Sequence, residues 1–253
     1  MTDALTCDAF LDGKVQIWQP RRGYRAATDP VFLAAAVSAR PGQSVLELGC
    51  GVGVAALCLA ARVSGLSLTG VELQPEYAAL ARRNAAANGV DLEVIEADLC
   101  ALPPPLRARR FDHVIANPPY YAARGPAAAD PGRDRALREA TPLAEWVDVA
   151  LRRTRDLGHI TLIHLAERLP DLLAAFHGRA SCTVLPLAAR RARAARRIIL
   201  QARKGARAPF TLLPPLVIHQ GDSHPGDGEH FTDRVRVLMR DAGTLDMAAM
   251  ARA

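Results

Sequence analysis

A glycine-rich loop between an apolar strand and a helix places the strongest constraint on the fold of this chain. Ser44 to Leu48 is an apolar run of strand length, Gly49-Cys50-Gly51-Val52-Gly53 follows it, and Val54 to Arg62 has helical composition. Glycines let a backbone approach a ligand closely at a helix amino end. Their spacing, Gly-x-Gly-x-Gly, differs from the Gly-x-Gly-x-x-Gly of NAD-binding folds. The unit predicts an α/β fold with a ligand site beside the loop.

Polar residues end the next apolar runs. Glu72 closes a predicted strand from Ser67, Asp98 lies just beyond Leu92 to Glu96, and a helix is predicted from Pro75 to Asn88 between them. Glu72 lies 19 residues after Gly53, where a carboxylate can accept both hydroxyls of a ribose. Asp98 could accept a bond from an adenine amino group, or simply stabilise a turn. Because ligands bind at the carboxyl ends of parallel strands, these residues predict one adenosine-type site.

A fourth strand, Phe111 to Ala116, runs into Asn117-Pro118-Pro119-Tyr120. Two prolines stop the strand and fix the backbone as it leaves. Asn117 Oδ1 and the Pro118 carbonyl could accept the two N–H bonds of a planar NH2 group, while Tyr120 stacks on its ring. The structural alternative is an Asn-Pro turn closed by a core tyrosine.

The remaining segments complete the predicted fold. Asp29 is expected to cap a helix that starts at Pro30, while Tyr24, Thr28 and Asp29 either line a ligand pocket or only support that helix. Further predicted elements are an edge hairpin over Phe10–Trp18, helices over 142–154, 167–178 and 231–240, strands over 158–165, 181–187 and 196–203, an edge extension over 210–220 and a loop over 221–230.

Together these elements predict a Rossmann-like α/β fold with helices on both faces. Its central sheet is mostly parallel and seven-stranded, with a C-terminal antiparallel strand pair. Three segments are expected: residues 1–40 complete the ligand pocket, residues 41–220 form the catalytic domain, and residues 221–253 form a tail with a possible helix.

Positive charge is concentrated near the predicted C-terminal strand pair. Residues 188–207 carry eight Arg or Lys side chains and no acid, in a chain of net charge +6. The cluster is either a solvated hairpin tip or a contact for a phosphate backbone. The stretch 121–139, which mixes Gly, Pro and both charges, is expected to be a substrate loop, with a solvated connector as the alternative.

Other features limit the class of protein. The five cysteines are scattered, with no Cys-x-x-Cys or Cys/His spacing, so we expect reduced thiols, no metal site and a cytoplasmic location. No secretory signal is visible at the start of the sequence. The longest apolar run, Gly51 to Ala61, is too short to span a bilayer, so we expect no membrane association.

The chain resembles the class I S-adenosylmethionine methyltransferases. Glu47 to Gly53 is similar to their cofactor loop, Glu72 to their ribose ligand, Asp98 to their adenine contact, and Asn117 to Tyr120 to their catalytic motif. Tyr24 to Pro30 resembles a motif of the tRNA1(Val) adenine-N6 methyltransferases, which modify position 37 beside the anticodon. Two residues depart from the family pattern: Glu47 replaces a commoner aspartate, and Ala27 a commoner glycine.

The resemblance implies S-adenosylmethionine as cofactor and tRNA as partner. It implies a catalytic set formed by Asn117, Pro118, Pro119 and Tyr120. The implied cofactor set is Tyr24, Thr28, Asp29, Glu47, Gly49, Gly51, Gly53, Glu72, Leu73, Asp98, Leu99 and Asn117. The RNA set is expected to contain Arg21, Arg22, Arg25, Arg124, Arg190, Arg191, Arg193, Arg196 and Arg197.

Three alternatives remain open beside adenine methylation in RNA. A protein glutamine methyltransferase would use the same two acceptors, but that family has a helical domain ahead of the cofactor loop, where only 43 residues precede Ser44. A DNA adenine methyltransferase usually has a large target-recognition segment. A non-catalytic RNA-binding protein on this fold would not need an intact Asn117 to Tyr120.

Overall fold

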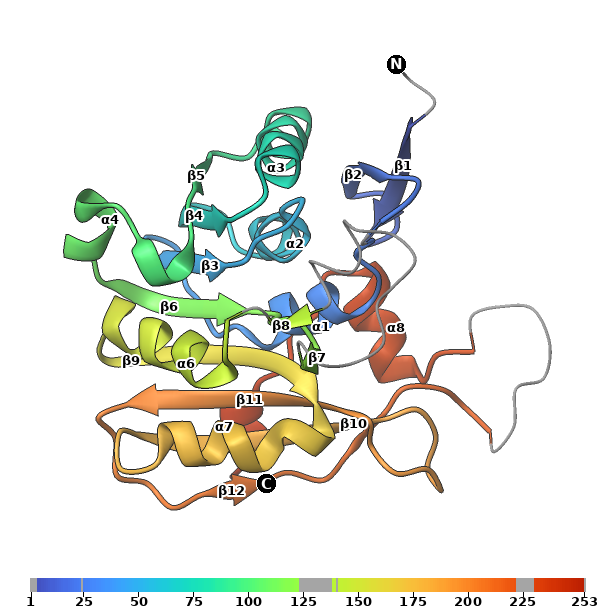
Figure 1. Cartoon of the computed structure of the whole chain (residues 1–253). Coiled ribbons are helices and arrows are strands. Elements are labelled where there is room, and N and C mark those ends of the chain that lie inside the picture. Colours follow the sequence, from blue (N-terminus) through green and yellow to red (C-terminus); the bar gives the residue numbers. More distant parts are fainter. Residues whose placement is uncertain (1–3, 24, 123–137, 140, 222–229, 253) are drawn as a thin grey trace.

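The computed structural model describes residues 4–23, 25–122, 138–139, 141–221 and 230–252. One large sheet organises them (Figure 1). Its strands are β3 (Ser44–Leu48), β4 (Ser67–Glu72), β5 (Leu92–Glu96), β6 (Phe111–Ala116), β9 (Thr154–Leu165), β10 (Ala180–Ala188), β11 (Arg197–Lys204), β12 (Thr211–Leu212) and β13 (Leu216–Val217). The order is β12-β10-β11-β9-β6-β3-β4-β5, and β13 also pairs with β10.

The strand directions match the predicted α/β class. β3, β4, β5, β6 and β9 run parallel, and β11 is antiparallel to both β9 and β10. The prediction of seven strands was wrong, because the sheet has nine. The predicted edge extension is split into β12 and β13, which flank Pro214 and Pro215. Proline lacks an N–H group, so it interrupts the hydrogen-bond ladder at an edge.

Helices cover both faces of the sheet (Figure 1). One face packs against α1 (Asp29–Ala36), α2 (Val54–Arg62), α3 (Pro75–Ala87) and α8 (Asp233–Arg240), and the other against α4 (Pro104–Ala108), α6 (Leu143–Arg153) and α7 (Leu169–Phe176). Side chains alternate between the two resulting cores: Leu162 of β9 belongs to the second, and Ile163 to the first. Central strands buried on both faces explain the continuous apolar runs in the sequence.

The shorter elements are two 3-10 turns, a C-terminal helical turn and two strand pairs. They are η2 (Leu99–Ala101), η3 (Ala166–Arg168), α9 (Met247–Met250), β1 (Leu5–Phe10) with β2 (Val15–Pro20), and β7 (Tyr121–Ala122) with β8 (Arg138–Glu139). Among the described residues, no helix has the length and apolar character needed to cross a membrane.

The amino-terminal hairpin differs from its prediction. It forms a separate two-stranded sheet, rather than an edge of the main one. Asn84 of α3 holds it: its Oδ1 accepts from the Trp18 N–H at 2.8 Å, and its Nδ2 donates to the Trp18 carbonyl at 3.0 Å. The Asn88 amide makes the same pair of bonds with Gln16. Two amide side chains therefore replace a neighbouring strand, which an apolar pattern cannot reveal.

Three other boundaries were wrong. α1 begins at Asp29 with Thr28 at the N-cap position, because the Asp29 carboxylate has other partners. α4 was not predicted and starts at Pro104, within a run of three prolines; proline is well tolerated in a first helical turn. β9 starts at Thr154, four residues before the predicted Gly158, with an irregular register opposite β6.

Candidate functional site

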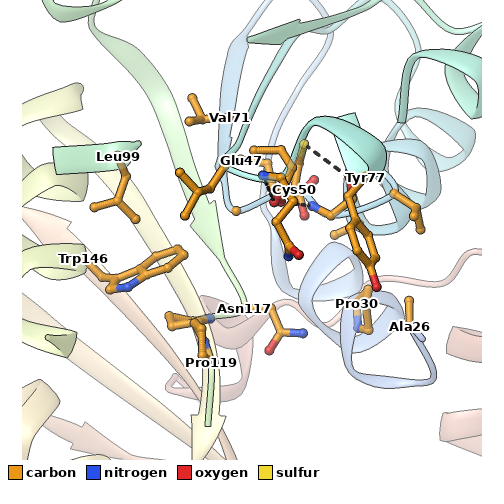
Figure 2. A pocket seen from close by; sticks show the side chains of 18 of the residues that line it. Ala26, Pro30, Glu47, Cys50, Val71, Tyr77, Leu99, Asn117, Pro119 and Trp146 are labelled. Carbon is orange, nitrogen blue, oxygen red and sulfur yellow. Dashed lines mark hydrogen bonds between the residues drawn. The ribbon is translucent and has the colours of Figure 1, made fainter. Parts of the chain in front are cut away.

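A cavity of about 1150 Å³, including its open mouth, lies at the carboxyl ends of β3, β4 and β6. Figure 2 shows Leu99 and Trp146 on one side of it, Tyr77 and Pro30 on the other, and Asn117 between them. Carboxyl ends of parallel strands meet at one edge, which explains how segments distant in sequence share this cavity.

This cavity is lined by most of the residues that the sequence assigned to cofactor binding. They are Glu47, Gly49, Gly51, Glu72, Leu73, Asp98, Leu99 and Asn117. Thr28, Asp29 and Gly53 are not part of its lining. Gly53, with φ +88°, packs instead against Ala81 of α3 and Leu92 of β5. Tyr24 lies outside the described residues.

Glu72 joins the glycine loop to the end of β4. Its Oε2 accepts from the Gly51 N–H at 2.8 Å, and its Oε1 accepts from the Gln74 N–H at 2.9 Å. Burial raises the pKa of Glu72, and these backbone bonds oppose that rise. Each carboxylate oxygen has a second lone pair, so Glu72 can hold the loop and still accept bonds from a ligand diol.

Glu47 lies deeper in the cavity wall and is only 4% exposed. Its Oε2 accepts from the Ala56 N–H of α2 at 3.0 Å. Burial, partly offset by that bond, raises the pKa of Glu47 to about 8. A cationic ligand group nearby would favour the ionised form. Asp98 is more exposed, and its Oδ1 accepts from the Cys100 N–H at 2.8 Å.

Two aromatic residues of the wall were missed from the sequence. Tyr77 of α3 and Trp146 of α6 are 6% and 7% exposed and line the cavity. The Trp146 Nε1–H is buried without a hydrogen-bond partner among the described residues. Both belong to helices that the sequence predicted, but nothing in the helical pattern separates a cavity wall from a core.

Gly49 packs directly under Trp146. Its φ is +65°, and a Cβ at this position would lie 2.7 Å from Trp146 Cη2. Gly49→Ala should therefore lower the free energy of unfolding for two reasons. Left-handed backbone strain should contribute ~1–2 kcal/mol, and overpacking against Trp146 a further ~1–3 kcal/mol. Gly89→Ala is the matched control, because Gly89 has φ +64° but a Cβ added there would have no atom within 4 Å. Urea unfolding measures both losses, and equal losses would contradict the packing argument.

The Asn117-Pro118-Pro119-Tyr120 segment follows β6 and lines the cavity. The Tyr120 hydroxyl contacts Asn117 Oδ1 at 2.8 Å and also Asp29 Oδ2. The fully buried His164, at the end of β9, accepts from the Leu165 N–H through Nδ1 at 2.8 Å. Its Nε2, 3.3 Å from the Pro119 carbonyl, is therefore the donor of the neutral ring. The turn is thus supported from the strand beside it.

The arginines assigned to RNA fall into two groups. Arg21, Arg22, Arg191, Arg193 and Arg196 are exposed. The others are engaged within the protein: Arg190 is 8% exposed and donates to the carbonyls of Gln220 and Gly221, Arg25 pairs with Asp8 at 2.5 Å, and Arg197 pairs with Asp29 at 3.0 Å. Arg124 lies outside the described residues. Sequence charge alone could not distinguish the two groups.

Among the described residues, no cluster of three or more His, Cys, Asp or Glu side chains could hold a metal ion.

Residues 28–130 match the family model of the methyltransferase small domain.

Among the relatives in the curated proteins are tRNA1(Val) (adenine(37)-N6)-methyltransferases from two strains of Porphyromonas gingivalis. One is 29% identical, with 91% of this chain and 93% of the relative covered; the other is 32% identical, with 65% and 68% covered. A release factor glutamine methyltransferase from Deinococcus radiodurans is 40% identical, but only 34% of this chain and 30% of that protein are covered.

Among solved structures, a predicted O-methyltransferase from Agrobacterium tumefaciens superposes with a TM-score of 0.70. It is 26% identical to this chain, and the match covers 86% of this chain and 98% of that one.

Proposed function

Because the chain belongs to the tRNA1(Val) (adenine(37)-N6)-methyltransferase family, we propose that it methylates the exocyclic N6 of an adenine in tRNA, at position 37 beside the anticodon. The observation that carries this proposal is one cavity lined by both the glycine loop with Glu72 and by Asn117. The residues assigned to the cofactor and the residue assigned to accept a hydrogen bond from the substrate amine thus line the same cavity. A tRNA substrate also implies a cytoplasmic location.

The cavity suits S-adenosylmethionine. Glu72 offers a carboxylate for the ribose, Asp98 an acceptor for adenine, and Glu47 a buried carboxyl for the cationic end. Leu73 and Leu99 supply apolar contacts beside these acids. The cofactor, when bound, supplies a methyl group on a sulfonium, which needs in-line placement and no further activation.

The chain's own part in the reaction is to prepare the nitrogen. The lone pair of an adenine N6 is delocalised into the ring, so the amine is a weak nucleophile. Asn117 Oδ1 and the Pro118 carbonyl would accept its two N–H bonds and favour a pyramidal nitrogen. Those bonds strengthen as positive charge develops, so they stabilise the transition state more than the ground state. Tyr120 offers a stacking surface for a base that leaves its stack.

The test is methyl transfer from labelled S-adenosylmethionine to total tRNA, with release factor and DNA as parallel acceptors. We expect label in tRNA, and N6-methyladenine at position 37 when the digested RNA is mapped by mass spectrometry. Label in release factor instead would support glutamine methylation, for which the 40% identical stretch of the Deinococcus radiodurans relative is the supporting observation. A glutamine amide would use the same acceptors.

The exposed arginines of the β10–β11 loop are proposed to contact tRNA phosphates. Changing Arg191 and Arg193 to Gln should weaken tRNA binding and reduce the slope of log affinity against log salt by up to ~2 units. Changing Arg107 and Arg110 to Gln is the charge-matched control, because these exposed residues precede β6, at the opposite edge of the sheet. Filter binding across salt concentrations measures the slopes, and equal slopes for both pairs would exclude the loop.

A further inference from the structure

Tyr120 is held by residues from three distant parts of the chain. Asp29 comes from the first turn of α1, His164 from the end of β9, and Arg197 from the start of β11. The guanidinium carbon of Arg197 lies 4.6 Å from the centre of the Tyr120 ring. The His164 ring meets that ring edge to face, with centroids 5.4 Å apart. The ring orientation is therefore fixed, and with it the plane in which a base can stack.

The Tyr120 hydroxyl has one hydrogen and two acceptors within reach. Asn117 Oδ1 lies 2.8 Å from the hydroxyl oxygen, and Asp29 Oδ2 is also within hydrogen-bond distance. A hydroxyl donates one hydrogen, so the two acceptors compete for it. The Asp29 carboxylate is the stronger acceptor, because hydrogen bonds to an ionised group are roughly twice as strong as neutral ones.

Arg197 keeps Asp29 in place. Its Nε donates to Asp29 Oδ2 at 3.0 Å, and the two side chains are 33% and 22% exposed. Burial disfavours the charge on Arg197, but Asp29 and Tyr120 outweigh that effect and raise its pKa. An ion pair sheltered to this degree is less screened than a fully exposed one. Asp29 is thus fixed in position beside the hydroxyl.

We propose that Asp29, held by Arg197, draws the Tyr120 hydroxyl hydrogen away from Asn117 Oδ1 and so leaves the full acceptor strength of this oxygen for the substrate amino group. An amide oxygen can accept two hydrogen bonds, but each bond weakens the other because both draw on the same negative charge. Asp29 and Arg197 are then positioning residues: they act through Tyr120 and Asn117. This inference rests on the proposed function, because it assigns Asn117 Oδ1 as an acceptor in the reaction. It also gives Asp29 a role different from the cofactor contact expected from the sequence.

The inference predicts a rescue that a purely structural role would not give. Asp29→Asn keeps the size of the side chain but removes its charge, so the hydroxyl should turn to Asn117 Oδ1, and kcat on tRNA should fall roughly tenfold. The KM for tRNA and the Kd for S-adenosylmethionine should stay within twofold. Tyr120→Phe removes the competing hydroxyl but keeps the ring. In that background Asp29→Asn should have no effect, and the double variant should be faster than Asp29→Asn alone.

Asp112→Asn serves as the matched control. Asp112 is also a partly exposed carboxylate, 20%, that pairs with an arginine, Arg155 at 2.7 Å, but it lies at the start of β6, at the opposite edge of the sheet. It should lower the melting temperature and leave kcat unchanged in both backgrounds. Independent, multiplicative losses from Asp29→Asn and Tyr120→Phe, or a loss confined to KM, would overturn the inference. Wild-type protein inactive on tRNA would instead overturn the proposed function.

Discussion

Asn117→Ala is expected to slow methyl transfer to tRNA by roughly 100- to 1000-fold, the scale for loss of one hydrogen-bonding group that acts on developing charge. The variant removes an acceptor that lines the cavity, where Asn117 Oδ1 already lies 2.8 Å from the Tyr120 hydroxyl. Because this acceptor is assigned to the amine and its bond strengthens in the transition state, the loss should appear in kcat. Single-turnover kinetics with labelled cofactor measures it.

Cofactor affinity provides the control for Asn117. The chain has two tryptophans, Trp18 and Trp146, and only Trp146 lines the cavity. In a Trp18→Phe background, Trp146 fluorescence should report binding of S-adenosylmethionine, with similar Kd values before and after Asn117→Ala. Asn117→Asp keeps an oxygen acceptor and should retain more activity than the alanine variant. Near-normal turnover of Asn117→Ala would falsify the proposed role.

Glu72→Ala should weaken binding of S-adenosylmethionine by ~1.5–3 kcal/mol, the scale for hydrogen bonds to a charged group, or roughly 10- to 150-fold in Kd. The effect has two sources. The variant removes the acceptor assigned to the ribose, and it frees the Gly51 and Gln74 N–H groups that Glu72 now holds. The loop should therefore loosen as the ligand contact is lost. The same Trp146 titration measures the Kd.

Two further variants separate these sources. Glu72→Gln keeps an amide oxygen that can accept from one backbone N–H, so it should bind the cofactor better than Glu72→Ala. Glu96→Ala is the positional control, because Glu96 pairs with Glu72 in register at the end of β5 but does not line the cavity. If Glu72→Ala and Glu96→Ala bind S-adenosylmethionine with the same Kd, Glu72 does not bind the ribose.

Strand positions could be read from the sequence where a short apolar run has a clear end. β3, β4, β5 and β6 begin and end at the predicted residues, because each is an apolar run closed by a glycine, acid or amide. The same logic placed Glu72, Asp98 and Asn117 at one edge, where they line a common cavity. A parallel sheet makes this inference possible, since strand ends alone define which residues meet.

Contacts between distant side chains could not be read in this way. Trp146 lies in the cavity wall because Gly49 leaves room beneath its ring, which depends on how α6 packs on β3. Arg25 and Arg190 looked like RNA contacts by charge, yet each is bonded within the protein. Asp29 looked like a helix cap, but its carboxylate pairs with a residue 168 positions later. Such pairings exist only after the chain has folded.

That long separation orders events during synthesis on the ribosome. The described residues that line the cavity lie within the first 146 positions, whereas Arg197, the partner of Asp29, comes later in the chain. The amino-terminal segment makes two contacts of still longer span. Lys14 Nζ donates to the Arg240 carbonyl, and the Leu245 N–H donates to the Ala35 carbonyl, both at 2.7 Å. Contacts of this span form late. In a nascent chain, the described residues of the cavity wall are therefore synthesised before the arginine that holds Asp29 beside Tyr120.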